Sequence, residues 1–259
     1  MKISVITVNY NNPLGLERTI KSVLRQTSSD FEYIIIDGAS TKGDLDVIKK
    51  YDNGVIKWVS EKDSGIYNAM NKGVRKASGD YCIFINSGDE LFSSNTIEQI
   101  INCNLQADFV QGTIARPGNP IIYCKAPNED QLTLGWYYAG YNNFHQASVI
   151  RRDMLLQHPY DEKYRVSADL KFNVECLIKN ECSYQNIDVV VALYEYGGIS
   201  TTKEHAAEVE NLYIELFGKR IMSDIVDTDF LRHFPMRLIA SKLRKLGTAK
   251  LWQKIKRSR

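Results

Sequence analysis

The stretch that decides the fold is Ile3-Ser4-Val5-Ile6-Thr7-Val8-Asn9-Tyr10, a β-branched apolar run that ends in polar residues. Pro13 and then apolar residues at helical spacing follow it, so a strand leads into a helix. The same alternation continues with strands expected at 31–37, 55–59 and 81–85 and helices at 45–51 and 64–77. Strands that are apolar on both faces and separated by helices predict a parallel sheet covered on two sides.

Beyond residue 89 the alternation loosens. The pattern there predicts helices at 96–105, 168–179 and 203–222 and strands at 108–113, 147–150 and 189–196. Residues 115–145 are rich in Gly, Pro, Asn and aromatic side chains and give no clear periodicity. We therefore expect an α/β chain whose second half is less regular than its first.

Polar clusters follow three of the expected strands: Asn9-Tyr10-Asn11, Asp37-Gly38 and Asn86-Ser87-Gly88-Asp89. Ligands of such sheets bind at the carboxyl ends of the strands, so these clusters should converge. Tyr10 suits stacking on a base, and Asp37 suits a uracil N–H or a ribose hydroxyl. Asp89 suits a divalent cation whose other oxygen ligands come from a diphosphate. Each cluster alone is equally an ordinary turn.

Two nucleotide-binding signatures are absent from the sequence. No GxGxxG motif follows the first strand, and no GxxxxGK[ST] motif occurs, which disfavours redox Rossmann enzymes and P-loop NTPases. The five cysteines are scattered without a CxxC pair, a pattern typical of reduced thiols in a cytosolic protein.

The net charge of +2 hides a strong asymmetry along the 259 residues. Residues 1–229 hold 23 basic and 31 acidic side chains, a net charge of −8, and residues 230–259 hold ten basic side chains and no acid. In this tail, apolar residues and Trp252 alternate with Lys and Arg at near-helical spacing, which is typical of a helix lying in a membrane surface. The alternative is a helix packed on the domain. Nucleic-acid binding is disfavoured because no known nucleic-acid-binding motif accompanies the charge.

Several blocks in order carry a family resemblance. They are residues 3–12, Gln26-Thr27, residues 37–41, residues 61–73, Ser78-Gly79-Asp80 and residues 86–89, with weaker blocks at 144–146, 164–169 and 197–200. Together they resemble a family-2 glycosyltransferase of the GT-A fold, of the kind that assembles bacterial exopolysaccharide, capsule and colanic acid. The resemblance is strong over roughly residues 1–90 and weaker beyond.

The resemblance implies a nucleotide-sugar donor, a divalent metal (Mn²⁺ or Mg²⁺) and inversion at the anomeric carbon. Carried over by position, the implied donor-binding residues are Thr7, Val8, Asn9, Tyr10, Asp37, Asp63, Lys72, Ser87 and Gly88. Asp89 matches the metal-binding aspartate, and Asp169 matches the general base. Ser87 and Gly88 stand where another Asp is common, which implies a weak, substrate-assisted metal site.

Other interpretations remain open for several of these residues. Asp169 equally complements a helix dipole, and Lys72 equally is a solvated helix residue. His145 is a second catalytic candidate that would touch the metal, the diphosphate or the acceptor, or else a packed core histidine. The aromatic residues Trp136, Tyr137, Tyr138, Tyr141 and Phe144 form either an acceptor-binding wall or core.

The sequence thus predicts a GT-A-like, mixed and mostly parallel sheet flanked by helices. Residues 1–229 form the transferase domain, with a donor half at 1–114 and an acceptor half at 115–229, and residues 230–259 form a basic amphipathic segment. The expected activity is transfer from a UDP-sugar to a saccharide or lipid-linked saccharide in bacterial surface polysaccharide synthesis, without a nucleic-acid partner. The expected location is the cytoplasm and the inner face of its membrane. The alternative is a catalytically silent nucleotide-sugar-binding subunit of an assembly complex.

Overall fold

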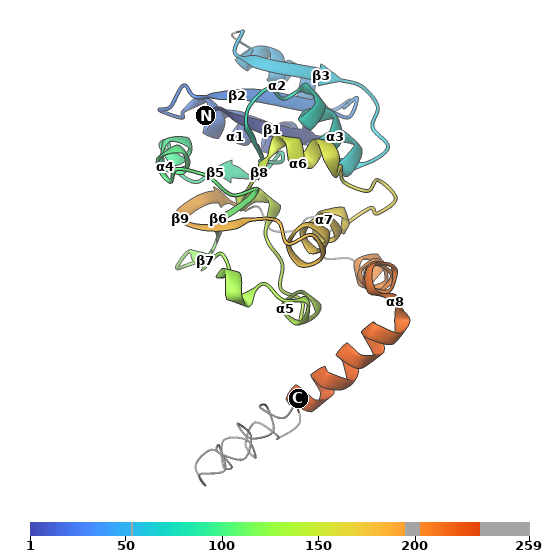
Figure 1. Ribbon diagram of the computed structural model, residues 1–259. Coiled ribbons are helices and arrows are strands. Elements are labelled where there is room, and N and C mark those ends of the chain that lie inside the picture. Colours follow the sequence, from blue (N-terminus) through green and yellow to red (C-terminus); the bar gives the residue numbers. More distant parts are fainter. Residues whose placement is uncertain (53, 195–202, 234–259) are drawn as a thin grey trace. The chain divides into compact units, whose positions relative to one another are not determined.

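The computed structural model describes residues 1–52, 54–194 and 203–233 (Figure 1). The chain divides into two compact units, residues 1–208 and 209–259, and the sheet and the candidate site belong to the first. No helix among the described residues combines the length and the apolar content that a membrane span requires.

A nine-stranded mixed sheet organises the first unit. Its larger parallel part is formed by the neighbouring strands β3 (Ile56–Ser60), β2 (Phe31–Asp37), β1 (Ile3–Asn9) and β4 (Tyr81–Phe84). The sheet continues through β8 (Ser148–Arg151), β6 (Phe109–Arg116), β9 (Tyr184–Leu193) and β5 (Glu90–Leu91), and β7 (Ile122–Cys124) pairs with β6. β4 and β8 are antiparallel, so the direction changes there. The mixed sheet is confirmed.

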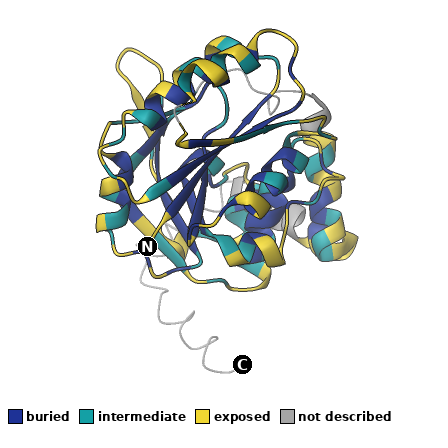
Figure 2. Cartoon of the chain, turned by 90° about the horizontal axis from the view of Figure 1, so that it is seen from above, coloured by how far each residue is buried: buried dark blue, intermediate teal, exposed yellow. Residues whose placement is uncertain are grey.

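Helices cover both faces of the parallel part because successive side chains of a strand point to opposite faces. Ile3, Val5 and Ile35 share one buried cluster with Leu16 and Ile20 of α1. The helices of that face are α1 (Pro13–Leu24), α2 (Asp44–Tyr51) and α4 (Thr96–Asn102). Buried positions are concentrated in the strands and in the helix faces turned toward them (Figure 2).

The helix α3 (Ile66–Lys76) packs against the opposite face of β1 and β2. Gly73 makes this close approach possible, since a Cβ atom there would lie 2.5 Å from Cγ2 of Ile6 and 3.6 Å from Cγ1 of Ile36. The N-cap of α3 is Gly65, so the predicted start at residue 64 is slightly early. The helix is otherwise as predicted.

The remaining helices are α5 (Leu134–Tyr138), α6 (Arg152–Gln157), α7 (Ala168–Val174) and α8 (Lys203–His233), with short 3₁₀ turns at Glu129–Gln131 and His145–Ala147. The helix predicted over 168–179 is α-helical only to Val174 and continues as a π-helical segment, Glu175–Lys179. The last strand begins at Tyr184, five residues before its predicted start. Most of the predicted basic segment, residues 234–259, and the motif at 197–200 lie outside the described residues.

Candidate active site

The ends of β1 and β2 meet, as the strand alternation predicts, because Asn9 and Asp37 are paired in register. The Asn9 amide nitrogen donates to Asp37 Oδ1 (2.8 Å), and Asp37 Oδ2 accepts from the Ser60 hydroxyl (2.6 Å) and the Ser40 backbone N–H (3.0 Å). Burial raises the pKa of Asp37, but the hydrogen bonds from Ser40, Ser60 and Asn9 lower it by more. The net pKa of Asp37 is therefore below its usual range. Asp37 is fully buried and fixes the loop after β2, so its direct contact with a nucleoside stays a prediction.

The backbone of Val8 and the side chain of Thr7 fix the loop after β4. The Thr7 hydroxyl donates to the Ile85 carbonyl (2.7 Å), and the Val8 carbonyl accepts from the Ser87 N–H (3.1 Å). Both residues are buried, so they hold the end of β4 beside the end of β1. With the pairing of Asn9 and Asp37, all three predicted polar clusters therefore meet at the end of β1.

Tyr10, Gly38 and Asp63 form a corner beside these strand ends. Tyr10 is 69% exposed. A Cβ atom at Gly38 would lie 3.2 Å from the Tyr10 ring and 3.3 Å from Asp63 Oδ2, so the glycine leaves room between an aromatic face and a carboxylate. Such a pair suits a base that stacks and a hydroxyl or N–H that donates. The sequence places Gly38 in a polar cluster with Asp37, but only the fold shows that the Tyr10 ring and Asp63 lie beside it.

Lys72 lies on α3 next to this corner. Its Nζ is 2.6 Å from Asp63 Oδ1 and 2.8 Å from Glu61 Oε1. The hydrogen bonds with Asp63 and then Glu61 raise the pKa of Lys72, which stays a cation. The charge of Lys72 is thus shared with two carboxylates, and its contact with a diphosphate remains a prediction.

The loop 86–89 is held rigidly against α1. Thr19 accepts from the Gly88 N–H (3.0 Å) and its hydroxyl donates to the Asp89 carbonyl (2.7 Å). Gly88 has a φ of +111°, a left-handed conformation that favours glycine. Gln146 donates its amide N–H to Asp89 Oδ2 (3.1 Å) and so orients the carboxylate.

Asp89 is the residue in this loop that could hold a metal. Among residues 1–52, 54–194 and 203–233, no cluster of three His, Cys, Asp or Glu side chains could hold a metal ion. A carboxylate oxygen is nevertheless the ligand type that Mg²⁺ accepts alongside the oxygens of a phosphorylated substrate. A divalent ion bound jointly by Asp89 and a donor diphosphate therefore stays a prediction, and Asp89 would be its protein ligand from this loop.

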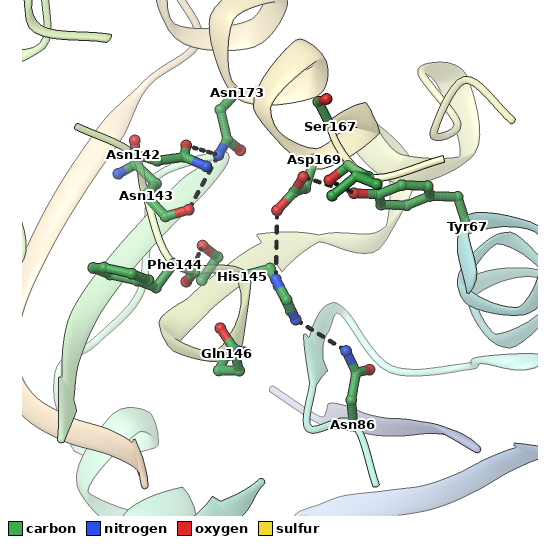
Figure 3. A network of polar contacts seen from close by, with 12 residues as sticks. Tyr67, Asn86, Asn142, Asn143, Phe144, His145, Gln146, Ser167, Asp169 and Asn173 are labelled. Carbon is green, nitrogen blue, oxygen red and sulfur yellow. Dashed lines mark hydrogen bonds and ion pairs between the residues drawn. The ribbon is translucent and has the colours of Figure 1, made fainter. Parts of the chain in front are cut away.

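Asp169, at the second position of α7, is the centre of a second polar network (Figure 3). Tyr67 of α3 lies with its hydroxyl 2.8 Å from Asp169 Oδ1 and 2.7 Å from the Val166 carbonyl. His145 Nδ1 is 3.4 Å from Asp169 Oδ2. Burial raises the pKa of Asp169, but His145 and Tyr67 lower it more, so the carboxylate is ionised at neutral pH.

Asn86 completes this network and links it to the loop of Asp89. Its amide Nδ2 is 3.0 Å from His145 Nε2. With that nitrogen donating, Nε2 accepts, and the imidazole proton on Nδ1 faces Asp169. The adjacent residues His145 and Gln146 therefore bind the candidate base and the candidate metal ligand respectively. A packed, hydrogen-bonded histidine would have the same two polar partners, so a catalytic part for His145 stays a prediction.

The segment before His145 is tied to α7 as well. The Asn173 amide donates to Asn142 Oδ1 (3.0 Å) and to the Asn143 carbonyl (3.3 Å), as Figure 3 shows. Of the predicted aromatic wall, Tyr137 is 2% exposed and belongs to the core. The rings of Trp136 and Tyr141 stack 5.5 Å apart, and Tyr141 is 59% exposed. Acceptor binding by Trp136 and Tyr141 therefore stays a prediction.

The mixed α/β sheet, the corner of Tyr10, Gly38 and Asp63 at its strand ends, the single-aspartate loop and the partly buried Asp169 carboxylate form the arrangement that the family resemblance predicts. The family model described as glycosyl transferase family 2 matches residues 4–155. A PGL/p-HBAD biosynthesis glycosyltransferase of Mycobacterium tuberculosis is 30% identical over 241 residues, which cover 90% of this chain and 84% of that protein. The chain belongs to glycosyl transferase family 2, and it is a glycosyltransferase.

Solved structures share the fold. S. aureus TarS 1–349 in complex with UDP-GlcNAc has a TM-score of 0.65 at 16% identity, over 83% of this chain and 66% of that one. The mannosyltransferase PcManGT from Pyrobaculum calidifontis, in complex with GDP-Man and Mn²⁺, has a TM-score of 0.58 at 12% identity, over 98% of this chain and 82% of that one. The predicted GT-A-like fold is confirmed.

Proposed function

We propose that this glycosyltransferase moves a sugar, with inversion, from a UDP-sugar to a saccharide acceptor. The observation that carries the proposal is the partly buried Asp169 carboxylate, ionised and oriented by Tyr67 and His145. An acceptor hydroxyl must lose its proton as it attacks the anomeric carbon, and a fixed carboxylate can take that proton. TarS with bound UDP-GlcNAc, a protein of the same fold, supports this donor class.

Each part of the site has a place in this reaction. The corner of Tyr10, Gly38 and Asp63 would bind the nucleoside, and Asp89, oriented by Gln146, would hold Mn²⁺ or Mg²⁺ together with the donor diphosphate. When bound, the metal supplies positive charge against the leaving diphosphate. The acceptor oxygen forms the new bond to the anomeric carbon as the bond to the diphosphate breaks. The hydroxyl proton passes to the Asp169 carboxylate, while His145 holds that carboxylate in place.

For the acceptor, we propose a lipid-linked saccharide of surface polysaccharide synthesis, at the inner face of the cytoplasmic membrane. The support is the charge distribution, since residues 230–259 carry ten basic side chains and no acid. Each basic residue near an anionic surface is worth about 1 kcal/mol, so several together would hold the enzyme beside a lipid-linked acceptor. Flotation with anionic vesicles, with and without residues 230–259, tests this assignment. Equal binding by both forms would remove it.

The transfer reaction is tested with a panel of nucleotide sugars and Mn²⁺, measuring released nucleoside diphosphate with and without saccharide acceptors. Asp169→Asn should keep donor affinity and lose transfer by about 10²–10⁴-fold. The matched control is Asp153→Asn, because Asp153 also lies in the first turn of a helix but is 56% exposed. Full turnover by Asp169→Asn would exclude Asp169 as the base. Donor binding by the unmodified enzyme without turnover on any acceptor would favour the silent-subunit alternative.

A further inference from the structure

Glu208 of α8 fills a cluster of backbone donors just before the candidate base. Its Oε2 accepts from the Arg165 N–H (2.9 Å). Its Oε1 accepts from the N–H groups of Val166 (2.9 Å) and Ser167 (2.7 Å) and from the Ser167 hydroxyl (2.7 Å). Successive backbone N–H groups that point to one side form an anion-binding concavity. Here the anion is a carboxylate of the same chain.

These donors lead directly into the helix that carries Asp169. Ser167 is the N-cap of α7, yet its side chain makes no capping bond within the helix, because its hydroxyl donates to Glu208. The Ser167 carbonyl accepts the first helical bond, from the Lys171 N–H (2.9 Å). Glu208 thus binds the N–H of the N-cap residue itself, two residues before Asp169, as the glutamate of a capping box does.

Val166 is held from two directions. Its N–H donates to Glu208, and its carbonyl accepts from the Tyr67 hydroxyl (2.7 Å), which also contacts Asp169. One residue of this loop is therefore bonded to α3 and to α8. Displacement of the loop would move both the Asp169 backbone and the Tyr67 contact that orients its carboxylate.

The bonds require an ionised carboxylate. Burial raises the pKa of Glu208, but the Ser167 hydroxyl and the three backbone N–H groups lower it more, so the group is an anion at neutral pH. A glutamine side chain offers one acceptor oxygen and turns an N–H₂ group toward the backbone donors. Glu208→Gln would therefore take the acceptor away from at least one of the four donors, which are exposed or partly buried, at nearly unchanged volume.

We propose that Glu208 is a positioning residue for catalysis, which acts through the backbone of residues 165–167 to hold Asp169 in its working orientation. This inference rests on the proposed role of Asp169 as the base. Its effect should appear in the rate of the chemical step and leave the donor corner of Tyr10, Gly38 and Asp63 unchanged.

The test compares the full-length Glu208→Gln and Glu208→Asp variants with Glu210→Gln, a change at an exposed glutamate on the same helix. Hydrogen exchange of the amides of residues 165–167 reads the loop directly and needs no turnover. Exchange should be about tenfold faster or more in Glu208→Gln, intermediate in Glu208→Asp and unchanged in the control. The kcat for transfer should fall by about tenfold or more in Glu208→Gln, by less in Glu208→Asp and not at all in the control, with donor KM unchanged in each.

Each outcome bears on one proposal. Faster exchange with unchanged kcat would show that the contacts are merely structural, and unchanged exchange would show that Glu208 does not hold the loop; either result overturns the inference. A parallel loss of donor affinity, kcat and unfolding midpoint would also overturn it in favour of general destabilisation. If the unmodified enzyme transfers no sugar from any donor, the proposed function fails, and the exchange data still show whether the loop depends on Glu208.

Discussion

Glu32 offers a quantitative test of what holds the sheet together at the edge away from the site. Its carboxylate is 5% exposed and accepts from the Ser4 hydroxyl (2.6 Å) and the Gly79 N–H (3.1 Å). It also accepts from the Ser78 N–H and pairs with Lys57 Nζ (2.6 Å). One side chain of β2 therefore ties β1, β3 and the segment before β4 together. The perturbation is Glu32→Gln.

The magnitude follows from the pKa of Glu32. Burial raises it, but the bonds from Lys57, Ser4 and Ser78 lower it more, from 4.5 to about 2. A shift of that size corresponds to about 3 kcal/mol of unfolding free energy. Because Lys57 is 57% exposed and its charge is screened by solvent, we reduce this to about 2 kcal/mol. Since the folded pKa is the lower one, this stability is present above pH 4.5 and is lost as the pH falls toward 2.

Urea unfolding of the enzyme and of Glu32→Gln, near pH 7 and at about pH 3, measures this contribution. The two proteins should differ by about 2 kcal/mol near pH 7 and by less than half of that at about pH 3. Glu98→Gln, at an exposed glutamate of α4 with one side-chain bond to Thr27, should change neither value. A difference between the two proteins that does not depend on pH would refute the assignment to an ionised carboxylate.

Three further changes probe the site and its support. Tyr67→Phe removes a bond that lowers the pKa of Asp169, so the acid limb of the kcat/KM profile for transfer should move to higher pH; an unmoved limb would separate Tyr67 from the base. Gly38→Val would fill the space beside the Tyr10 ring, and donor Kd by calorimetry should rise about tenfold or more at an unchanged unfolding midpoint. Gly73→Ala would place a methyl 2.5 Å from Ile6 and should lower the unfolding free energy by about 1–3 kcal/mol in urea titrations; an unchanged value would mean that α3 shifts freely.

The parallel part of the fold and the meeting of its strand ends could be predicted from the sequence. Asn9 and Asp37 end two apolar runs, and parallel neighbours in register must bring such ends together. The detailed role of Asp37 could not be predicted in the same way. Its hydrogen bonds come from Ser40 and Ser60, and the amino-acid sequence alone does not show which donors surround a buried carboxylate.

The network around Asp169 lies beyond sequence reasoning because its members are far apart along the chain. Tyr67 is 102 residues from Asp169, Asn86 is 59 from His145, and Glu208 is 41 from Ser167. Helical periodicity indicates which side chains share a face, but it does not indicate the partner of that face. Asp169 itself was accessible only through the family resemblance, since an acid in a first turn is common in any helix.

The position of α3 has a consequence for engineering this enzyme. One face of α3 is fixed against β1 by Gly73, and Tyr67 and Asn71 of the same helix bond to the loop that carries residues 160–169. A chimera that replaces the C-terminal half to obtain a new acceptor would keep its donor corner and yet misalign its base, unless the grafted loop also bonds to these two side chains. Recombination at this boundary should therefore conserve the surface of one helix rather than a length of sequence.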